Sequence, residues 1–180
     1  MFYDGFGNKG SCSARGGGHV AQGLNFKLLY GEQSVGPTQT NWRFCNKCYV
    51  MFYDGYADKG SCVTGGGHFA QGIVFSLPHS VPSSAIAQGD WQYCQKCHAM
   101  FYDGYADKGA CSAGGGHVAQ GLNFALPHHF AGIYAGCKDI GFRTEFKDPW
   151  RGFSRAVRAG FRFQRLYVTA RRSRCSTTSL

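Results

Sequence analysis

Two groups of three cysteines and one histidine recur at the same spacing, and these residues have the types and positions that could do chemistry. Each group reads C-x-x-C, thirteen residues, Cys, five residues, His. Thiolates and a neutral imidazole suit tetrahedral zinc, and a C-x-x-C pair followed by a second ligand pair is a usual sequence form of a structural site. The predicted ligands are Cys45, Cys48, Cys62 and His68 for one site and Cys94, Cys97, Cys111 and His117 for the other.

Four protein ligands close a tetrahedral site, so we expect about two zinc ions per chain with a structural and not a catalytic role. Disulfide bonding is the alternative, which a secreted chain would favour. Three cysteines per group would leave one thiol unpaired, however, and would give the histidine no role. A redox-active C-x-x-C is a third interpretation, but it belongs near a βαβ pattern that this sequence lacks.

A triplet of glycines, residues 65–67 and 114–116, precedes the histidine of each group. Glycine adopts positive φ without strain and lets backbone N–H groups approach a thiolate, so the triplets fit a metal loop. The alternative function for such a glycine triplet is a phosphate-binding loop. Neither a following Lys-Thr pair nor a helix pattern accompanies the glycines, which disfavours it.

Both ligand groups belong to an internal repeat, in which Trp42 and Met51 recur 49 positions later as Trp91 and Met100. A third copy opens the chain as MFYDGFGNKGSCSARGGGH and lacks the W-x-x-C-x-x-C half. The pattern WxxCxxCxxMF…GxC…GGGH…F/YxLP resembles a tandem repeat of bacterial and fungal proteins, many of them secreted and most without an assigned function. The resemblance covers residues 1–128. It implies zinc-ribbon-like ligand spacing and favours an extracellular protein, but it implies no activity.

The first copy retains only Cys12 and His19, an incomplete metal half-site, and its CSARGGGH is one residue longer than CVTGGGH. Two ligands do not close a zinc site, so we expect this half to be disordered or poorly folded. The alternative is that it borrows ligands from Cys137, Cys175 or a neighbouring chain.

The methionine at position 1 aligns with the middle of the other two copies. We therefore expect the chain to start inside a repeat, with a true N-terminus, and any export signal, upstream. The chain itself begins without the charged and then apolar pattern of a signal peptide, and none of its apolar runs is long enough to span a bilayer. The compartment is left open by these observations.

The predicted fold class is small, β-rich, metal-stapled repeats of short strands, turns and loops. Glycine is abundant, and aromatic runs such as MFYDG end in an Asp-Gly turn signal. Units of about 37 residues rarely fold on a hydrophobic core alone and need a staple. The predicted organisation is 1–28 truncated repeat, 29–41 linker, 42–78 repeat, 79–90 linker, 91–128 repeat and 129–180 basic tail.

Aromatic and polar residues of the complete copies are the candidates for ligand binding. Trp42 and Trp91 would either form a miniature core over the metal loops or stack on a sugar ring or a base. The segment DGYADKG suits a plain turn better than a calcium loop, which needs more oxygen ligands. The predicted ligand-binding residues are Trp42, Tyr56, Gln71, Trp91, Tyr105 and Gln120.

Positive charge is concentrated in the tail. Residues 138–180 hold 11 Lys or Arg against 3 Asp or Glu, a net +8, whereas residues 1–137 hold 8 against 7, a net +1. Residues 149–168 are predicted to form a basic amphipathic helix that could bind nucleic acid or an anionic membrane. The alternative, which the abrupt change in composition favours, is that the segment is non-native sequence, such as an out-of-frame extension. Its arginines are Arg151, Arg155, Arg158, Arg162 and Arg165.

Three functions from different classes remain open, because the sequence shows no nucleophile-base arrangement and no distinctive carboxylate pair. The first is a non-enzymatic module that binds carbohydrate at a cell surface through its loops, with avidity from tandem copies. The second is a nucleic-acid-binding zinc module that uses the basic tail. The third is a structural protein that self-associates.

Overall fold

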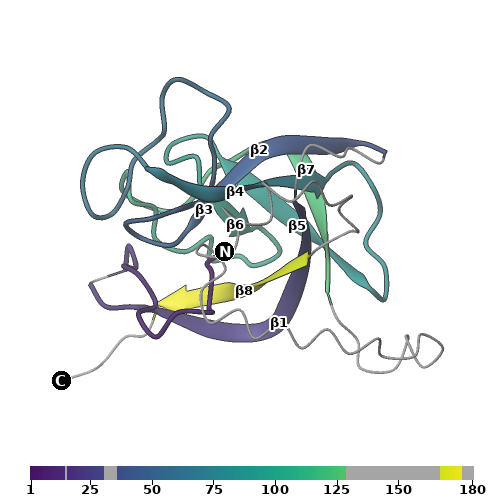
Figure 1. Cartoon of the computed structure of the whole chain (residues 1–180), viewed down its shortest axis with the longest axis horizontal. Coiled ribbons are helices and arrows are strands. Elements are labelled where there is room, and N and C mark those ends of the chain that lie inside the picture. Colours follow the sequence, from purple (N-terminus) through teal and green to yellow (C-terminus); the bar gives the residue numbers. More distant parts are fainter. Residues whose placement is uncertain (15, 31–35, 129–166, 176–180) are drawn as a thin grey trace, which may run out of the picture. The chain divides into compact units, whose positions relative to one another are not determined.

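A computed structural model of the chain describes residues 1–14, 16–30, 36–128 and 167–175, the last range as backbone only. These residues form strands, turns and bends without any helix (Figure 1), which confirms the β-rich prediction. Residues 149–166 of the predicted helix, which include its five arginines, lie outside the described residues. Its last two positions, 167 and 168, begin strand β8 (Tyr167–Cys175). No helix in the described part is long and apolar enough to cross a membrane.

Each complete copy folds as three antiparallel strands, and the middle strand pairs with both of the others. The middle strand carries the tryptophan and the first cysteine, the short second strand carries MFY, and the third carries AQGxxFxLP. Residues 38–41 and 87–90, predicted as linker, belong to the middle strands. The strands are β2 (Thr38–Cys45), β3 (Met51–Tyr53) and β4 (Ala70–Pro78) in the second copy, and β5 (Ala87–Cys94), β6 (Met100–Tyr102) and β7 (Ala119–Pro127) in the third.

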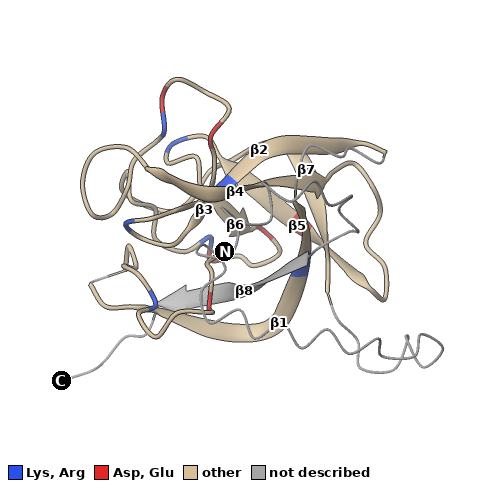
Figure 2. Cartoon of the chain, viewed as in Figure 1, with Lys and Arg blue, Asp and Glu red and all other residues tan. Residues whose placement is uncertain are grey.

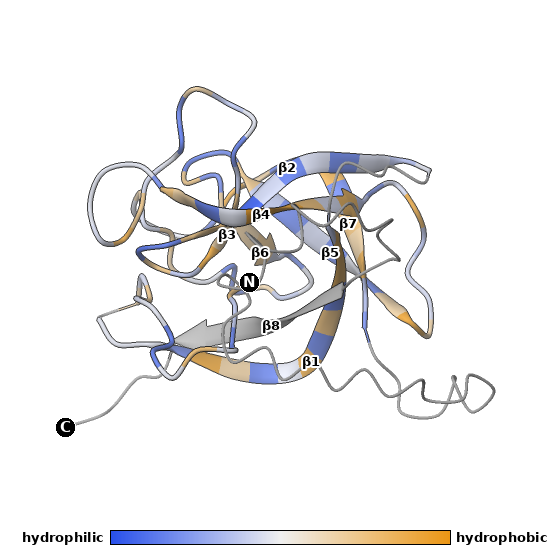
Figure 3. Cartoon of the chain, viewed as in Figure 1, coloured by the Kyte–Doolittle hydropathy of each residue, from blue (hydrophilic) through white to orange (hydrophobic). Residues whose placement is uncertain are grey.

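The first copy is folded, contrary to the prediction that it is disordered or poorly folded. Its strand β1 (His19–Tyr30) alternates apolar and polar residues (Figure 3), and this alternation buries Phe26 and Leu28 while Lys27 between them stays half-exposed. Such a period of two is what a half-buried strand requires. Its MFY segment also belongs to the core, because Phe2 is fully buried and Met51 N–H donates to the Met1 carbonyl at 3.0 Å.

Strand β8 takes the place of the strand that the first copy lacks. It pairs with β1 antiparallel, and Phe26 lies opposite Ala170. In the second copy the equivalent Phe75 lies opposite Trp42 of β2. The tail therefore contributes a strand to the repeat architecture, at the register of a W-x-x-C strand.

The three copies follow one another in a closed cycle. Tyr30, His79 and His128 occupy equivalent positions at the ends of β1, β4 and β7. Tyr30 pairs with Phe75 of the second copy, His79 with Phe124 of the third, and His128 with Phe26 of the first. The third copy therefore pairs with the first, so each copy pairs with both of the others.

Both repeat tryptophans lie in a core that the copies share. Trp42 and Trp91 are fully buried. The ring of Trp42 packs edge to face on Phe124 of the next copy at 5.2 Å and 82°, and Trp91 packs in the same way on Phe26 at 5.1 Å and 82°. Their predicted role in stacking on a ligand is therefore wrong, because neither ring has an exposed face; the alternative prediction, a core position, describes them.

Truncation of a shared-core tryptophan should be strongly destabilising. Trp91→Ala removes a fully buried side chain and leaves a cavity between two copies, so the free energy of unfolding should fall by about 3–5 kcal/mol. Denaturant unfolding monitored by circular dichroism measures this loss. The control is Tyr105→Ala, at a ring that is 40% exposed, for which we expect a change nearer about 0.5 kcal/mol. Equal stability of the two variants would contradict the shared core.

Candidate metal centres

The first two ligands of each group sit on a tight turn between the middle strand and the MFY strand. The Cys45 N–H donates to the Val50 carbonyl, and the Tyr49 N–H donates to the Cys45 carbonyl, both at 2.9 Å. Tyr49 closes this turn with φ 61°, and the equivalent His98 has φ 60°. We call this turn the knuckle, residues 45–50 and 94–99. It fixes both cysteines of C-x-x-C on one side of a short loop.

The glycine triplet forms the loop that brings the other two ligands to the knuckle. Cys62 N–H donates to the Gly66 carbonyl at 2.8 Å, and Gly65 and Gly66 have φ values of 96° and 62°. The predicted positive φ therefore occurs at the first two glycines of the triplet. The N–H groups that approach sulfur come from neighbouring residues instead, with Phe69 N–H donating to Cys45 Sγ at 3.5 Å and, in the third copy, Ala113 N–H to Cys111 Sγ at 3.4 Å.

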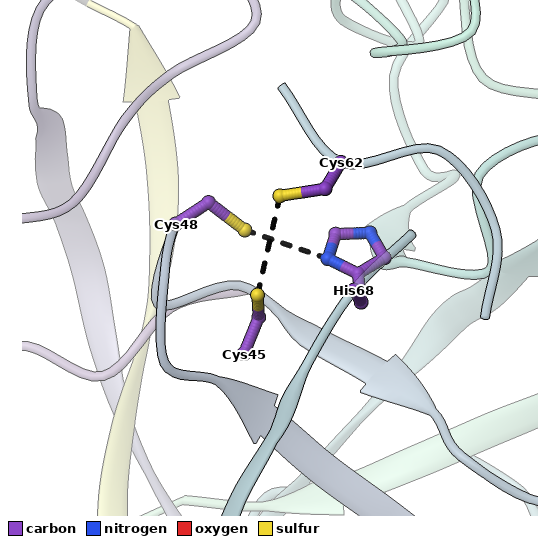
Figure 4. Close-up of side chains that lie close together, drawn as sticks. All are labelled: Cys45, Cys48, Cys62 and His68. Atoms are coloured by element: carbon purple, nitrogen blue, oxygen red, sulfur yellow. Dashed lines mark hydrogen bonds between the residues drawn. The ribbon is translucent and has the colours of Figure 1, made fainter. Parts of the chain in front are cut away.

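Four ligand atoms converge in the second copy, as Figure 4 shows. The Cys45 and Cys62 sulfurs lie 4.0 Å apart, Cys48 Sγ lies 3.5 Å from His68 Nδ1, and these two pairs cross one another. Zinc bonds of about 2.3 Å to sulfur and about 2.0–2.1 Å to nitrogen would place tetrahedral ligands about 3.8 Å (S to S) and about 3.6 Å (S to N) apart. These two separations therefore match the edges of a zinc tetrahedron.

The third copy repeats this geometry. Cys94 Sγ lies 3.9 Å from Cys111 Sγ, and Cys97 Sγ lies 3.5 Å from His117 Nδ1. In each group the four ligand atoms all lie within 4.8 Å of one another. The prediction of two groups that each hold one metal ion, and so of about two structural zinc ions per chain, is confirmed.

The cysteines of the two groups are free thiols, not cystines. Sulfur separations of 3.9 and 4.0 Å are about twice a disulfide bond. Without a cation the thiols cannot all ionise. The hydrogen bond with Cys48 lowers the pKa of Cys45 to about 3, while that same bond, together with burial, raises the pKa of Cys48 above its ordinary value. A divalent cation removes this conflict, because it stabilises every thiolate at once.

A lysine inside each knuckle supports the glycine loop. Lys47 Nζ donates to the carbonyls of Gly65 and Gly67 at 2.7 and 2.8 Å, and Lys96 Nζ donates to that of Gly114. Three thiolates and Zn²⁺ sum to a net charge of −1, so an ammonium group beside the site is favourable. Charged residues are otherwise few and scattered along the described chain (Figure 2).

An aromatic ring supports each ligating histidine. His68 stacks on Phe52 at 4.8 Å and 22°, and His117 stacks on Phe101 at 4.9 Å and 15°. The sequence prediction included neither these phenylalanines nor the knuckle lysines. The sequence feature that could have indicated them is recurrence at a fixed spacing from the ligands. A lysine and a phenylalanine occupy the same positions in both complete copies.

One hydrogen bond runs from a ligand of the second-copy centre to the knuckle of the third-copy centre. His68 Nε2 lies 3.1 Å from the Cys97 carbonyl oxygen, which belongs to the knuckle of the third copy. This bond fixes the proton on Nε2 and leaves Nδ1 free to ligate. His117 has no equivalent within the described residues and is half-buried, whereas His68 is buried.

Other predicted residues fall outside the metal groups. The segment DGYADKG is a plain turn, as predicted. Lys59 Nζ closes it by binding both the carboxylate and the backbone carbonyl of Asp54, at 2.8 and 2.7 Å. Tyr56 and Tyr105 are exposed, and so is Gln120, whereas Gln71 is half-buried. In the first copy Cys12 is disulfide-bonded and so is no free ligand. Burial lowers the pKa of His19 to about 4, which leaves its imidazole neutral at pH 7.

Fold and site together define a β-rich protein with two Cys3His groups, each able to hold one zinc ion. Comparison of the chain with protein-family models, curated proteins and solved structures gave no match. The resemblance to the bacterial and fungal tandem repeat therefore stays a prediction.

Zinc stoichiometry tests the two centres directly. Native mass spectrometry of the zinc-loaded chain should show two ions, and Cys62→Ser should retain one, because three ligands no longer close its site. Strong chelation should expose six reactive thiols and abolish the cooperative unfolding transition. A chain that binds no zinc, yet unfolds at the same denaturant concentration with and without chelator, would contradict the assignment.

The bond between the centres should couple their affinities. Cys111→Ser disables the third-copy site and loosens the knuckle that carries the Cys97 carbonyl, so zinc at the second-copy site should bind about tenfold more weakly. Competition with a chromophoric chelator measures the change. Because coupling between two bound ions is reciprocal, Cys62→Ser should also weaken the third-copy site, by a similar factor. Unchanged affinity in both variants would show that the sites are independent.

Proposed function

We propose that the chain is a non-enzymatic binding module whose zinc-stapled copies present loops to carbohydrate. The observation that supports this is an exposed tyrosine at the same loop position of both complete copies. Tyr56 is 51% exposed and Tyr105 is 40% exposed. The buried tryptophans leave these two rings as the predicted aromatic residues that a ligand could contact.

Each exposed tyrosine sits on a loop that is held in place from both sides. The ring of Tyr56 packs edge-on against Tyr53 at 5.0 Å and 74°, and the loop is closed by the bonds from Lys59 to Asp54. In the third copy Tyr105 packs on Tyr102 at 5.2 Å and 77°, and Lys108 closes the loop onto Asp103. A rigid aromatic ring loses little conformational entropy on binding and offers an apolar face with a polar hydroxyl, which suits the mixed surface of a sugar ring.

Zinc acts in this proposal as a staple and not as a reactive centre. Three sulfurs and one nitrogen fill the tetrahedron, so no coordination position is left for water or substrate. The metal holds the glycine loop on the knuckle, and the shared core holds one copy against the next. Two equivalent loops on one scaffold would gain avidity for a repeating glycan even if each contact were weak.

A glycan array probed with the zinc-loaded chain tests the proposal. Tyr56→Ala with Tyr105→Ala should lower retention about tenfold or more, because both stacking faces and their avidity are lost. The matched control is Phe69→Ala with Val118→Ala, which removes side chains that are 64% and 40% exposed on a different segment. Zinc stoichiometry should be unchanged in both double variants. Absence of retention on any sugar, or equal loss in the control, would refute the proposal.

A further inference from the structure

The first copy contains half of a metal site whose backbone already has the form of the complete ones. Cys12 N–H donates to the Gly17 carbonyl at 2.8 Å, as Cys62 N–H does to Gly66. The additional residue of CSARGGGH is absorbed between Cys12 and Gly17, because His19 N–H donates to the Lys9 carbonyl at 3.3 Å, the same bond that His68 makes with Lys59. The backbone thus places Cys12 and His19 as in a complete site.

The imidazole of His19 is also oriented as a ligand. Its ring stacks on Phe2 at 5.0 Å and 25°, like the two ligating histidines on their phenylalanines. His19 is only 7% exposed, and its Nδ1, the atom that ligates in the other copies, has no hydrogen-bond partner. A buried polar nitrogen without a partner is costly, and metal coordination is what satisfies its counterparts.

Among the described residues, the third copy lacks the contact with a knuckle that the first and second copies make. A Cβ added to Gly10 would overlap the Cys48 carbonyl, and one added to Gly60 would overlap the Cys97 carbonyl, because each glycine packs on the knuckle of the next copy. At the equivalent Gly109 the nearest described atom is a carbon of His117, 4.0 Å away. Among the described residues, none takes the place of a knuckle there.

We propose that the first copy accepts a W-x-x-C-x-x-C strand from a second chain of the same repeat, which forms a third Cys3His zinc site with Cys12 and His19. The strand would replace β8 on β1, at the register that β8 now occupies, by donor-strand complementation. The sequence of β8, YVTARRSRC, contains no tryptophan and no C-x-x-C pair. It fills the strand position with one cysteine, Cys175 opposite His19, where a W-x-x-C-x-x-C strand would bring two cysteines and a tryptophan.

Ligation by Cys12 requires its disulfide to be opened. A trialkylphosphine donates two electrons to the disulfide and becomes the phosphine oxide, with water providing the oxygen atom and the two protons of the resulting thiols. Three thiols and the neutral imidazole then bind Zn²⁺ and release three protons. The existing centres are unaffected by the reductant, because their cysteines are already free thiols.

The test uses the full chain in phosphine buffer with zinc and a synthetic peptide of residues 87–100, AQGDWQYCQKCHAM. Native mass spectrometry should show two zinc ions without peptide, and three zinc ions with one bound peptide. A control peptide with both cysteines replaced by serine should leave the count at two. A chain that keeps two ions in the presence of saturating cysteine peptide would overturn the proposal.

Variants of the chain show whether the third ion uses the predicted half-site. His19→Ala should return the count to two ions, whereas His79→Ala, at a histidine outside every Cys3His group, should keep three. A third ion that persists in His19→Ala would overturn the proposal. So would a third ion in the reduced chain without peptide, because the ligands would then come from elsewhere in the same molecule.

Discussion

Coordination of four ligand atoms at the corners of a tetrahedron is the interaction on which the rest of this structure depends. The knuckle and the glycine triplet are loops with little apolar surface, and neither would hold its conformation through burial alone. In both complete copies the four ligand atoms already lie within 4.8 Å of one another, with one S–S and one S–N pair at the separations of a zinc tetrahedron. Metal coordination therefore does locally what a hydrophobic core does in larger domains.

Aromatic packing between copies supplies the second level of organisation. The metal joins two loops within a copy, whereas Trp42 on Phe124 and Trp91 on Phe26 join one copy to the next. The cycle closes through the paired ends of β1, β4 and β7, so each copy completes its core with a neighbour's side chain. The bond from His68 to the Cys97 carbonyl links the two levels, because it makes the geometry of one metal centre depend on the knuckle of another.

The residues that stabilise each copy and the exposed tyrosines lie in different parts of the copy. The six ligand cysteines and the two tryptophans are buried, and the exposed tyrosines lie on loops whose lysine and aspartate side chains bind each other. The incomplete first copy breaks the repetition: there β8 occupies the position of the missing strand, and a histidine nitrogen has no hydrogen-bond partner.

The sequence by itself determined the ligands, the β-rich character and the turn that contains Tyr56. These are local properties, since a C-x-x-C knuckle, a glycine triplet and a lysine five residues after an aspartate act within a few residues of one another. Only the tertiary structure decided that both tryptophans are buried, that residues 38–41 are strand and that the tail strand lies on β1. Those outcomes depend on contacts between residues far apart in the chain, such as Trp42 and Phe124, and no spacing rule within one repeat specifies which copy provides the partner.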